Sequence, residues 1–329
     1  MKNYMPRLIL ATSLGFVVLL SIAGCNGKPN DQKTLAKVTI GYPVLRIALP
    51  IFVAKEKGFF DKQGLNVELK RYDTAQPMMD ALVSGNLDVG GYCALPITFG
   101  AMGRSKTQLV FLTAMMEDDQ HPISMLIVKK DSGIKTIKEL AGKRIGILPT
   151  RAYEVWLQKV LSTNGVDPTT VIIQQIAAPQ QADALGSGSV QALFTNDPAA
   201  TAAIVKGFGV LLTNTAMVPD ATGMKPFYFG SFNITKKFAD ENKETVKKIS
   251  LALDEAIAFI RNNPQEAREA MKKYFPPEQG GLVDRFPESF FRTTKEVSNE
   301  DLMRMRDYYK AENVLSADID INNAQYTGQ

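Results

Sequence analysis

The chain has 329 residues, of which 45% are hydrophobic and 22% are charged. A chain of this length and composition is globular and builds one large domain or two of ordinary size. The composition excludes a disordered, a collagen-like or a multi-span membrane protein. Basic residues number 38 and acidic residues 34, and so small an excess does not indicate a nucleic-acid surface or a nucleic-acid partner.

The first 24 residues have the features of a secretory signal. The segment MKNYMPR is positively charged, the segment LILATSLGFVVLLSIAG is apolar, and small residues precede Cys25. Residues 22–25 resemble a bacterial lipobox, so we expect a lipid on Cys25, a tether over residues 25–37 and an extracytoplasmic location at the bacterial membrane. A generic signal peptide and an uncleaved membrane anchor are the alternatives. Cleavage removes Lys2 and Arg7 and leaves 38 − 2 = 36 basic residues against 34 acidic ones.

Cysteine and histidine are too scarce for a disulfide framework or a zinc site. Once Cys25 is lipidated, Cys93 has no partner for a disulfide. The single histidine, His121, lies beside the acidic cluster Glu117–Asp119, which we interpret as a solvated hinge. We therefore expect neither a metal nor a cofactor.

The first half of the mature chain alternates strands and helices, which is typical of βαβ units and a mostly parallel sheet. Strands are predicted at 37–42, 65–72, 87–92 and 108–116, and helices at 48–60, 76–85 and 95–103. The pattern then starts again. Strands are predicted at 124–130, 143–148, 171–176, 190–194 and 210–214, with helices at 136–142, 152–165, 179–188 and 197–207.

The segment DALVSGNLDVGGY (80–92) recurs in degraded form as DALGSGSVQALFT (183–195). Both copies end a helix, turn at a glycine and continue as a strand. A return strand is predicted at 225–234, and an amphipathic helix at 244–264 has Val246, Leu253 and Ile260 on one stripe. We therefore expect two lobes, residues 38–120 with 222–329 and residues 121–221, joined by two crossings.

Helix N-termini are expected to meet in the cleft between the lobes, because ligands bind at the carboxyl ends of parallel strands. Unpaired N–H groups and a positive dipole end at these positions favour a small oxyanion. Arg46 and Arg151, one from each lobe, could add a charge-assisted clamp. Asp197 could pair with the amine of a zwitterionic ligand.

Each of these residues also has a structural interpretation. Thr74, Thr150 and Asp197 are equally suited to be helix N-caps. Arg46 and Arg151 could be solvated surface residues, and Tyr92 and Cys93 could belong to the core. A nucleophilic Cys93 is disfavoured, since no histidine lies near it in the sequence.

The chain resembles the sulfonate/nitrate/taurine class of ABC-transporter solute-binding proteins, whose superfamily includes binding proteins for thiamine-pyrimidine precursors. The resemblance is carried by ALPIFVAKEKGFFDKQGLNVEL, DALVSGNLDVG and LIVKKDSGIKTIKELAGKRIGI, in this order. It implies a type II periplasmic-binding-protein fold, hinge closure on a small-molecule solute, and delivery to the permease and ATPase subunits of an importer. We expect a binding protein and not an enzyme, because the sequence has one histidine, no cysteine cluster and a secretion signal, and we expect it to work as a monomer.

Carried over to this sequence, the resemblance implies a ligand site made of loops from both lobes. Its members are Pro43, Leu45, Arg46, Thr74, Tyr92, Cys93, Thr150, Arg151, Asn196, Asp197 and Tyr228.

The chain departs from the family pattern at Pro149–Arg151 and Asn196–Pro198, which puts taurine or nitrate in doubt as the ligand. Candidates to flank a flat or partly apolar ligand instead are Tyr92, Tyr153, Phe227 and Tyr228. The expected function is capture of a small sulfonate-like, nitrate-like or related organic solute. The alternatives are a pyrimidine or other aromatic vitamin precursor, a sensory lipoprotein on the same fold and, least favoured, an enzyme like the pyrimidine synthases.

Overall fold

The computed structural model of the protein describes residues 35–213 and 216–328. The predicted signal at 1–24, the lipidation at Cys25 and nearly all of the tether lie outside these residues. Residues 35–329 form one compact unit. No helix within the described residues has the length and apolar character needed to span a membrane.

The first sheet has six strands in the order β11-β4-β10-β3-β1-β2. Its strands are β1 (Ala36–Pro43), β2 (Leu65–Tyr72), β3 (Val89–Ala94), β4 (Leu109–Glu117), β10 (Phe227–Thr235) and β11 (Phe290–Arg292). β1 pairs in parallel with β2 and β3, whereas β10 runs antiparallel to both β3 and β4. β1 and β3 approach so closely that a Cβ on Gly91 would lie 2.3 Å from the carbonyl oxygen of Gly41.

The second sheet has five strands in the order β7-β6-β8-β5-β9. They are β5 (Met125–Lys129), β6 (Arg144–Ile147), β7 (Ile172–Gln175), β8 (Ala192–Thr195) and β9 (Gly209–Leu211). β6 is parallel to β7 and β8, and β5 is antiparallel to β8 and β9. Both sheets are therefore mixed, because the parallel strands are joined by antiparallel ones, β10 and β11 in the first sheet and β5 in the second.

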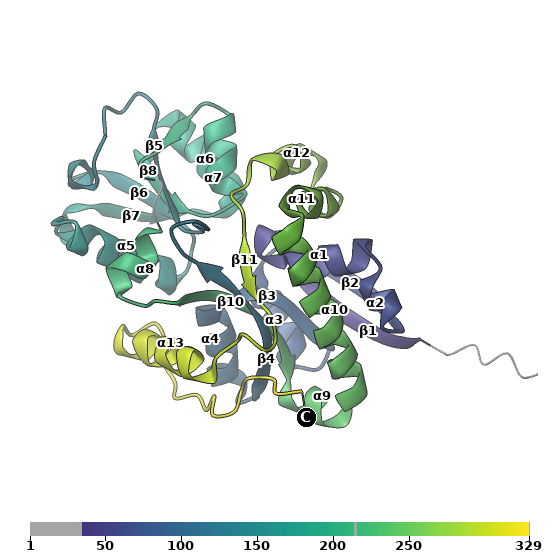
Figure 1. The fold of residues 1–329 in the computed structure, drawn as a ribbon. Coiled ribbons are helices and arrows are strands. Elements are labelled where there is room, and N and C mark those ends of the chain that lie inside the picture. The colour runs from purple at the N-terminus through teal and green to yellow at the C-terminus, as the bar shows by residue number, and fades with distance from the viewer. Residues whose placement is uncertain (1–34, 214–215, 329) are drawn as a thin grey trace, which may run out of the picture. The chain divides into compact units, whose positions relative to one another are not determined.

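Helices flank both sheets. The first sheet carries α1 (Leu49–Glu56), α2 (Phe59–Lys62), α3 (Ala75–Val83), α4 (Leu95–Ser105), α9 (Lys236–Glu241), α10 (Lys243–Asn262), α11 (Pro264–Lys272), α12 (Pro277–Gly280) and α13 (Asn299–Ala311). α10 packs beside α1 (Figure 1), and its predicted stripe, including Val246, Leu253 and Ile260, is buried. The second sheet carries α5 (Arg151–Thr163), α6 (Ala178–Ser187), α7 (Ala199–Val205) and α8 (Met217–Thr222).

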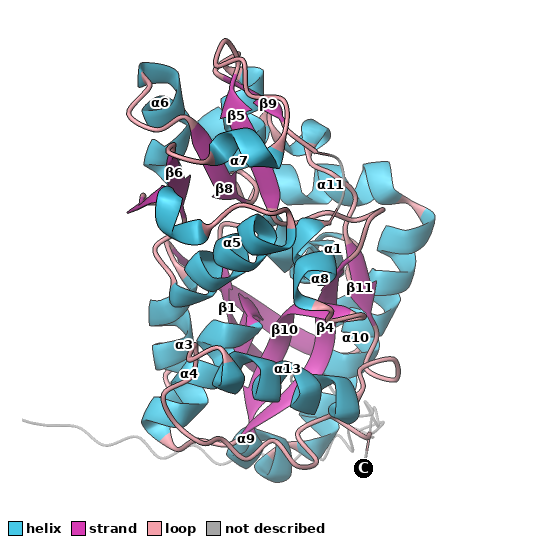
Figure 2. Cartoon of the chain, turned by 90° about the vertical axis from the view of Figure 1, so that its left-hand side faces the viewer, coloured by secondary structure: helices cyan, strands magenta, loops and turns pink. Residues whose placement is uncertain are grey.

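The chain passes between the sheets twice, from β4 to β5 and from β9 through α8 to β10. This confirms the two predicted crossings, and Figure 2 shows α5 in the region between the two sheets. The internal repeat is confirmed as α3–β3 and α6–β8. In each copy the turn uses a left-handed glycine, Gly85 with φ 78° and Gly188 with φ 79°. Each copy thus supplies one interior strand to its own sheet.

Candidate functional site

A cavity of about 430 Å³ lies where the loops of both sheets meet. The first sheet contributes the loop after β1, the start of α3 and the junction of β3 with α4. The second sheet contributes the segment from Leu148 into α5 and the loop after β8. The volume falls within the range of about 300–1,000 Å³ that is typical of small-molecule sites. The cavity therefore occupies the position predicted for a ligand.

Eight of the eleven predicted site residues line this cavity. They are Leu45, Arg46, Tyr92, Cys93, Thr150, Arg151, Asn196 and Asp197. They come from both sheets, as two lobes facing one cleft require.

Pro43, Thr74 and Tyr228 do not line the cavity. Pro43 is still part of β1, where it pairs with Tyr72, and Thr74 is exposed at the N-terminus of α3. The Tyr228 hydroxyl accepts hydrogen bonds from Arg292 and from the backbone N–H of Ser298, so this side chain is held in the core. The structure therefore places these three predicted residues away from the cavity, since closeness to a loop in the sequence does not fix whether a side chain faces the cleft.

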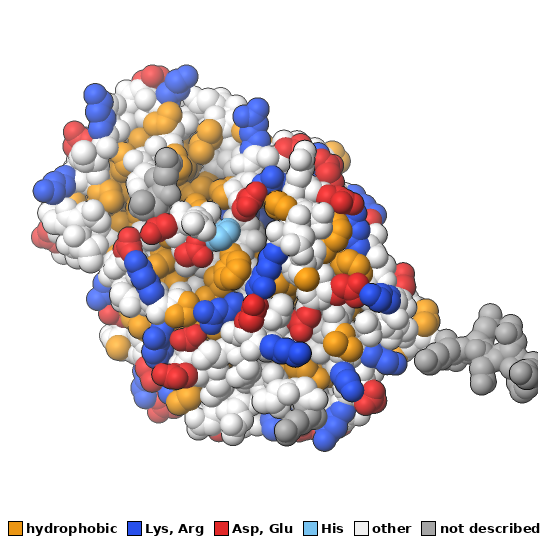
Figure 3. Space-filling model, viewed as in Figure 1, with side chains coloured by type: hydrophobic (Ala, Val, Ile, Leu, Met, Phe, Trp, Pro, Cys, Tyr) orange, Lys and Arg blue, Asp and Glu red, His pale blue; other side chains and the backbone are white. Residues whose placement is uncertain are grey.

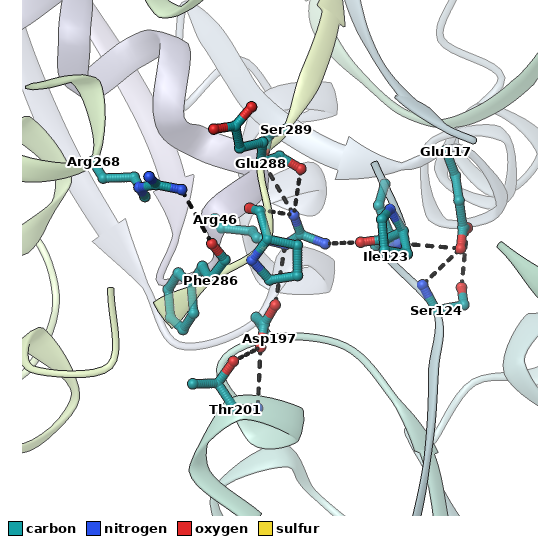
Figure 4. Close-up of polar contacts among 12 residues, drawn as sticks. Arg46, Glu117, Ile123, Ser124, Asp197, Thr201, Arg268, Phe286, Glu288 and Ser289 are labelled. Carbon is teal, nitrogen blue, oxygen red and sulfur yellow. Dashed lines mark hydrogen bonds and ion pairs between the residues drawn. The ribbon is translucent and has the colours of Figure 1, made fainter. Parts of the chain in front are cut away.

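Arg46 is neither a surface residue nor a free anion clamp. Its side chain is 3% exposed, and its Nε lies 3.3 Å from Oδ2 of Asp197, without the alignment of a hydrogen bond. Nη1 donates to the carbonyl oxygens of Pro287 and Glu288 and to Ser289 Oγ, and Nη2 donates to the carbonyl oxygen of Pro122 (Figure 4). Arg46 thus ties the loop after β1 to the second sheet, a crossing and the C-terminal region.

The Asp197 carboxylate has two partners within the protein, Arg46 and Thr201. Besides the ion pair, its Oδ1 accepts hydrogen bonds from the backbone N–H of Thr201 at 3.1 Å and from Thr201 Oγ1 at 2.6 Å. Burial raises the pKa of Asp197, against the lowering effects of Arg46 and Thr201. Burial likewise lowers the pKa of Arg46, against the charges of Asp197 and Glu117. The carboxylate expected to meet a ligand amine is therefore engaged by Arg46.

The start of α5 forms the polar wall from the second sheet. Thr150 is the N-cap, and its Oγ1 accepts a hydrogen bond from the backbone N–H of Tyr153 at 3.2 Å. Arg151 is 48% exposed and pairs with Glu154 at 2.8 Å. Thr150 therefore caps the helix and lines the cavity at once, and the two interpretations do not exclude each other.

Several buried polar atoms around the cavity have no hydrogen-bond partner among the described residues. They include Trp156 Nε1 and Asn196 Oδ1. Burial and the charge of Glu117 raise the pKa of Tyr153 well above its ordinary value. Trp156 was not predicted as a site residue. Its place on the inner face of α5 follows only from packing, because its ring contacts Phe227 and Phe229 of β10 at 5.7 and 5.8 Å between centroids.

Tyr92 and Cys93 belong to the core and also line the cavity. Tyr92 and Thr113 share a hydrogen bond between their hydroxyls, and burial raises the pKa of Tyr92 above its ordinary range. Burial also raises the pKa of the Cys93 thiol to about 12. A thiol with this pKa is protonated at neutral pH and is therefore a poor nucleophile.

Contrary to the prediction, the acidic cluster at the first crossing is not fully solvated. Glu117 is buried, and its carboxylate accepts hydrogen bonds from the backbone N–H groups of Ile123 and Ser124 and from Ser124 Oγ. Burial raises its pKa to about 7. His121 pairs with Asp118 at 2.8 Å and stacks on Phe290. Within the described residues no group of three His, Cys, Asp or Glu side chains is arranged to hold a metal.

One wall of the cavity was missed by sequence reasoning. Residues 314–317, which follow α13, line it together with α4. This segment packs so closely on α4 that a Cβ on Gly103 would lie 3.2 Å from the Cβ of Ala317. No motif marks the segment, because its role depends on the path of the chain after α13.

The fold and the site now allow comparison with known proteins. The family model described as NMT1/THI5 like matches residues 47–267. The chain belongs to the NMT1/THI5-like family. This agrees with the resemblance to the solute-binding class that includes pyrimidine-precursor binding proteins.

Among its relatives in sequence is a Bacillus subtilis (strain 168) protein named as a binding protein for aliphatic sulfonates. The two are 24% identical over 265 residues, which is 79% of this chain and 76% of the relative.

Solved structures show the same fold. The periplasmic aliphatic sulphonate binding protein SsuA from Escherichia coli aligns with a TM-score of 0.70 at 17% identity, over 88% of this chain and 97% of SsuA. The periplasmic nitrate-binding protein NrtA from Synechocystis PCC 6803 aligns with a TM-score of 0.65 at 17% identity, over 88% and 84% of the two chains. An enzyme shares the fold as well. The desulfurization enzyme DSZB, solved as a mutant in complex with biphenyl-2-sulfinic acid, aligns with a TM-score of 0.65 at 15% identity, over 88% and 96%.

Proposed function

We propose that this protein is the extracytoplasmic solute-binding component of an ABC importer and that it captures a small organic solute between its two sheets. The observation that carries the proposal is the cavity of about 430 Å³ lined by loops of both sheets. A solute held there contacts both sheets, so binding favours the closed arrangement over an open one. The two crossings are the segments that would bend.

The relatives make a sulfonate-like solute the first candidate. A flat aromatic solute such as a pyrimidine is the second, and the walls of the cavity favour it. Aromatic side chains approach from both sheets, among them Tyr92 and Phe99 from the first and Tyr153 and Trp156 from the second. Aromatic faces of this kind stack on planar rings.

The proposal includes a role in binding without catalysis. DSZB shows that the fold also supports an enzyme, so the fold does not decide the question. Cys93 is the cavity residue best suited in type to be a nucleophile, and its pKa of about 12 keeps it protonated. Among the described residues that line the cavity there is no histidine to act as its base.

Further parts of the proposal concern location and partners. A lipid on Cys25 would hold the protein at the outer side of the membrane, where a permease driven by its ATPase subunits would receive the solute. The lobe boundaries at 38–120 with 222–329 and at 121–221 belong to the proposal too. They are supported by the end of β4 at Glu117 and the start of β5 at Met125.

A thermal-shift screen tests this function. Sulfonates, nitrate, carboxylates, pyrimidines and flavins are added to the protein, and a saturable rise in melting temperature is expected with at least one of these classes, because a ligand that binds only the native state stabilises it. The absence of a shift with all five classes would contradict the proposed function.

A further inference from the structure

Each arginine that lines the cavity already has a carboxylate partner within the protein. Arg46 lies 3.3 Å from Asp197, Arg151 lies 2.8 Å from Glu154, and Arg104 lies 3.5 Å from Asp80. Among the described lining residues these arginines are the only basic side chains. The three pairs carry no net charge, so the described part of the cavity offers no unpaired cation to an anionic solute.

The N-terminus of α5, which lines the cavity, likewise has its partners within the protein. In α5 the Thr150 hydroxyl oxygen accepts from a first-turn N–H, and Glu154 places a carboxylate in the first turn. Both features take up the positive end of the helix dipole. The positive end of α5, which was expected to bind an oxyanion, is therefore already compensated by groups of the protein itself.

From this charge pairing we infer that the cavity takes an uncharged organic solute bearing both a hydrogen-bond donor and an acceptor, in preference to a sulfonate, nitrate or carboxylate. The inference rests on the proposed function and narrows its solute class. An anion enclosed beside neutralised pairs would be a buried charge without a counter-charge, which is unfavourable.

The unpartnered polar atoms favour the same class of solute. Asn196 Oδ1 is an acceptor, and it needs a donor. Trp156 Nε1 is a donor, and it can be satisfied by an acceptor. A sulfonate or nitrate ion carries acceptors only. An amide or a ring N–H beside a carbonyl carries both kinds of group.

The size and the walls of the cavity agree with an organic molecule. A cavity of about 430 Å³ is within the range of sites for organic small molecules and is far larger than nitrate would fill. Apolar side chains such as Phe99, Met115 and Phe229 line much of the remainder. A solute with a ring or an alkyl body therefore matches the cavity better than an inorganic ion.

Calorimetry with isosteric pairs tests the inference on the wild-type protein. p-Toluenesulfonamide is compared with p-toluenesulfonate, nicotinamide with nicotinate, and benzamide with benzoate. The members of each pair share their shape and differ in charge and in one donor group. The neutral member is expected to bind at least about tenfold more tightly in every pair that binds.

An anion that binds as tightly as its neutral partner, or more tightly, would overturn the inference. The inference is also overturned if none of the six compounds binds. A response to another class in the thermal-shift screen would then leave the proposed function standing, so failure of the solute class and failure of the function are distinguishable.

The variant Asp197→Asn supplies a second test. It removes the carboxylate that neutralises Arg46, so p-toluenesulfonate should gain at least about tenfold in affinity relative to p-toluenesulfonamide. Glu154→Gln is the matched control, because it frees Arg151 at a position 48% exposed, where water screens the charge and the gain should stay below about threefold. The inference is overturned if Asp197→Asn and the wild type show the same ratio of affinities for p-toluenesulfonate and p-toluenesulfonamide.

Discussion

Arg46 and Asp197 form an ion pair between the two sheets, with Nε and Oδ2 3.3 Å apart and both side chains buried. Arg46 follows β1 of the first sheet, and Asp197 follows β8 of the second. The same guanidinium donates to the segment 287–289 and to the first crossing at Pro122 (Figure 4). This pair therefore connects the parts of the chain that would move in the proposed closure.

Arg46→Met should destabilise the protein by about 3–5 kcal/mol, because it leaves Asp197 buried without its counter-charge. Urea unfolding measures this change. The double variant Arg46→Met/Asp197→Asn should be more stable than the single variant, since no buried charge then remains at the pair. The exposed pair Lys236–Asp240 is the control, and Lys236→Ala should cost less than about 1 kcal/mol. Similar losses of stability in Arg46→Met and Lys236→Ala would contradict the role given to Arg46.

Glu117 should make the stability depend on pH. Its pKa is about 7 in the native protein against an ordinary value of 4.5, so the native state binds the proton more tightly than the unfolded chain does. Its contribution is therefore fully present below about pH 4.5 and is lost as the pH rises to about 7. The loss amounts to at most about 3 kcal/mol.

Glu117→Gln keeps hydrogen-bonding atoms at both oxygen positions and removes the titration. The free energy of unfolding of the variant, measured from about pH 5 to about pH 8, should fall less steeply than that of the wild type. Identical slopes for the two proteins would show that Glu117 does not titrate in this range.

Thr150→Ala should reduce stability by about 1 kcal/mol, because it removes the N-cap of α5. Thr235→Ala is the matched control, since Thr235 caps α9 by the same contact with a backbone N–H and does not line the cavity. Both variants should lose similar stability, whereas solute affinity should drop by more than about threefold only in Thr150→Ala. An equal effect of both variants on affinity would exclude a direct role for Thr150.

Cys93 should react slowly in the native protein. A pKa of about 12 leaves on the order of a thousandfold less thiolate than an ordinary thiol has. Iodoacetamide labelling at neutral pH, followed by mass spectrometry of the peptide that holds Cys93, compares the native protein with the protein unfolded in urea. Labelling at similar rates in the two states would restore Cys93 as a candidate nucleophile.

Local sequence patterns were sufficient for most elements of the fold. The repeat at 80–92 and 183–195 predicted β3 and β8 as equivalent interior strands, and the stripe from Val246 to Ile260 predicted the buried face of α10. Most loops that line the cavity were also predictable, because they follow recognisable strands, whereas residues 314–317 follow α13 and carry no such signal. The resemblance to solute-binding proteins predicted the family.

Long-range contacts account for what the sequence did not indicate. Arg46 meets residues 287–289, which are more than 240 positions away, and nothing local marks either segment as a partner of the other. The direction of β10 was not readable either, since alternating hydrophobicity is the same in a parallel and an antiparallel strand. Exposure was misjudged at Glu117, because a carboxylate beside two aspartates resembles a solvated cluster. Acidic and basic side chains lie interspersed on the face of the molecule shown in Figure 3.

Trp156 is the chain's only tryptophan, and it lines the cavity while packing on β10. A fluorescence titration with the solutes that raise the melting temperature therefore reports directly on occupation of the space between the sheets. The account predicts a saturable change in the emission of Trp156, with a midpoint that matches the calorimetric Kd. A solute that stabilises the protein and leaves the emission unchanged at saturation would contradict the claim that this cavity is the binding site.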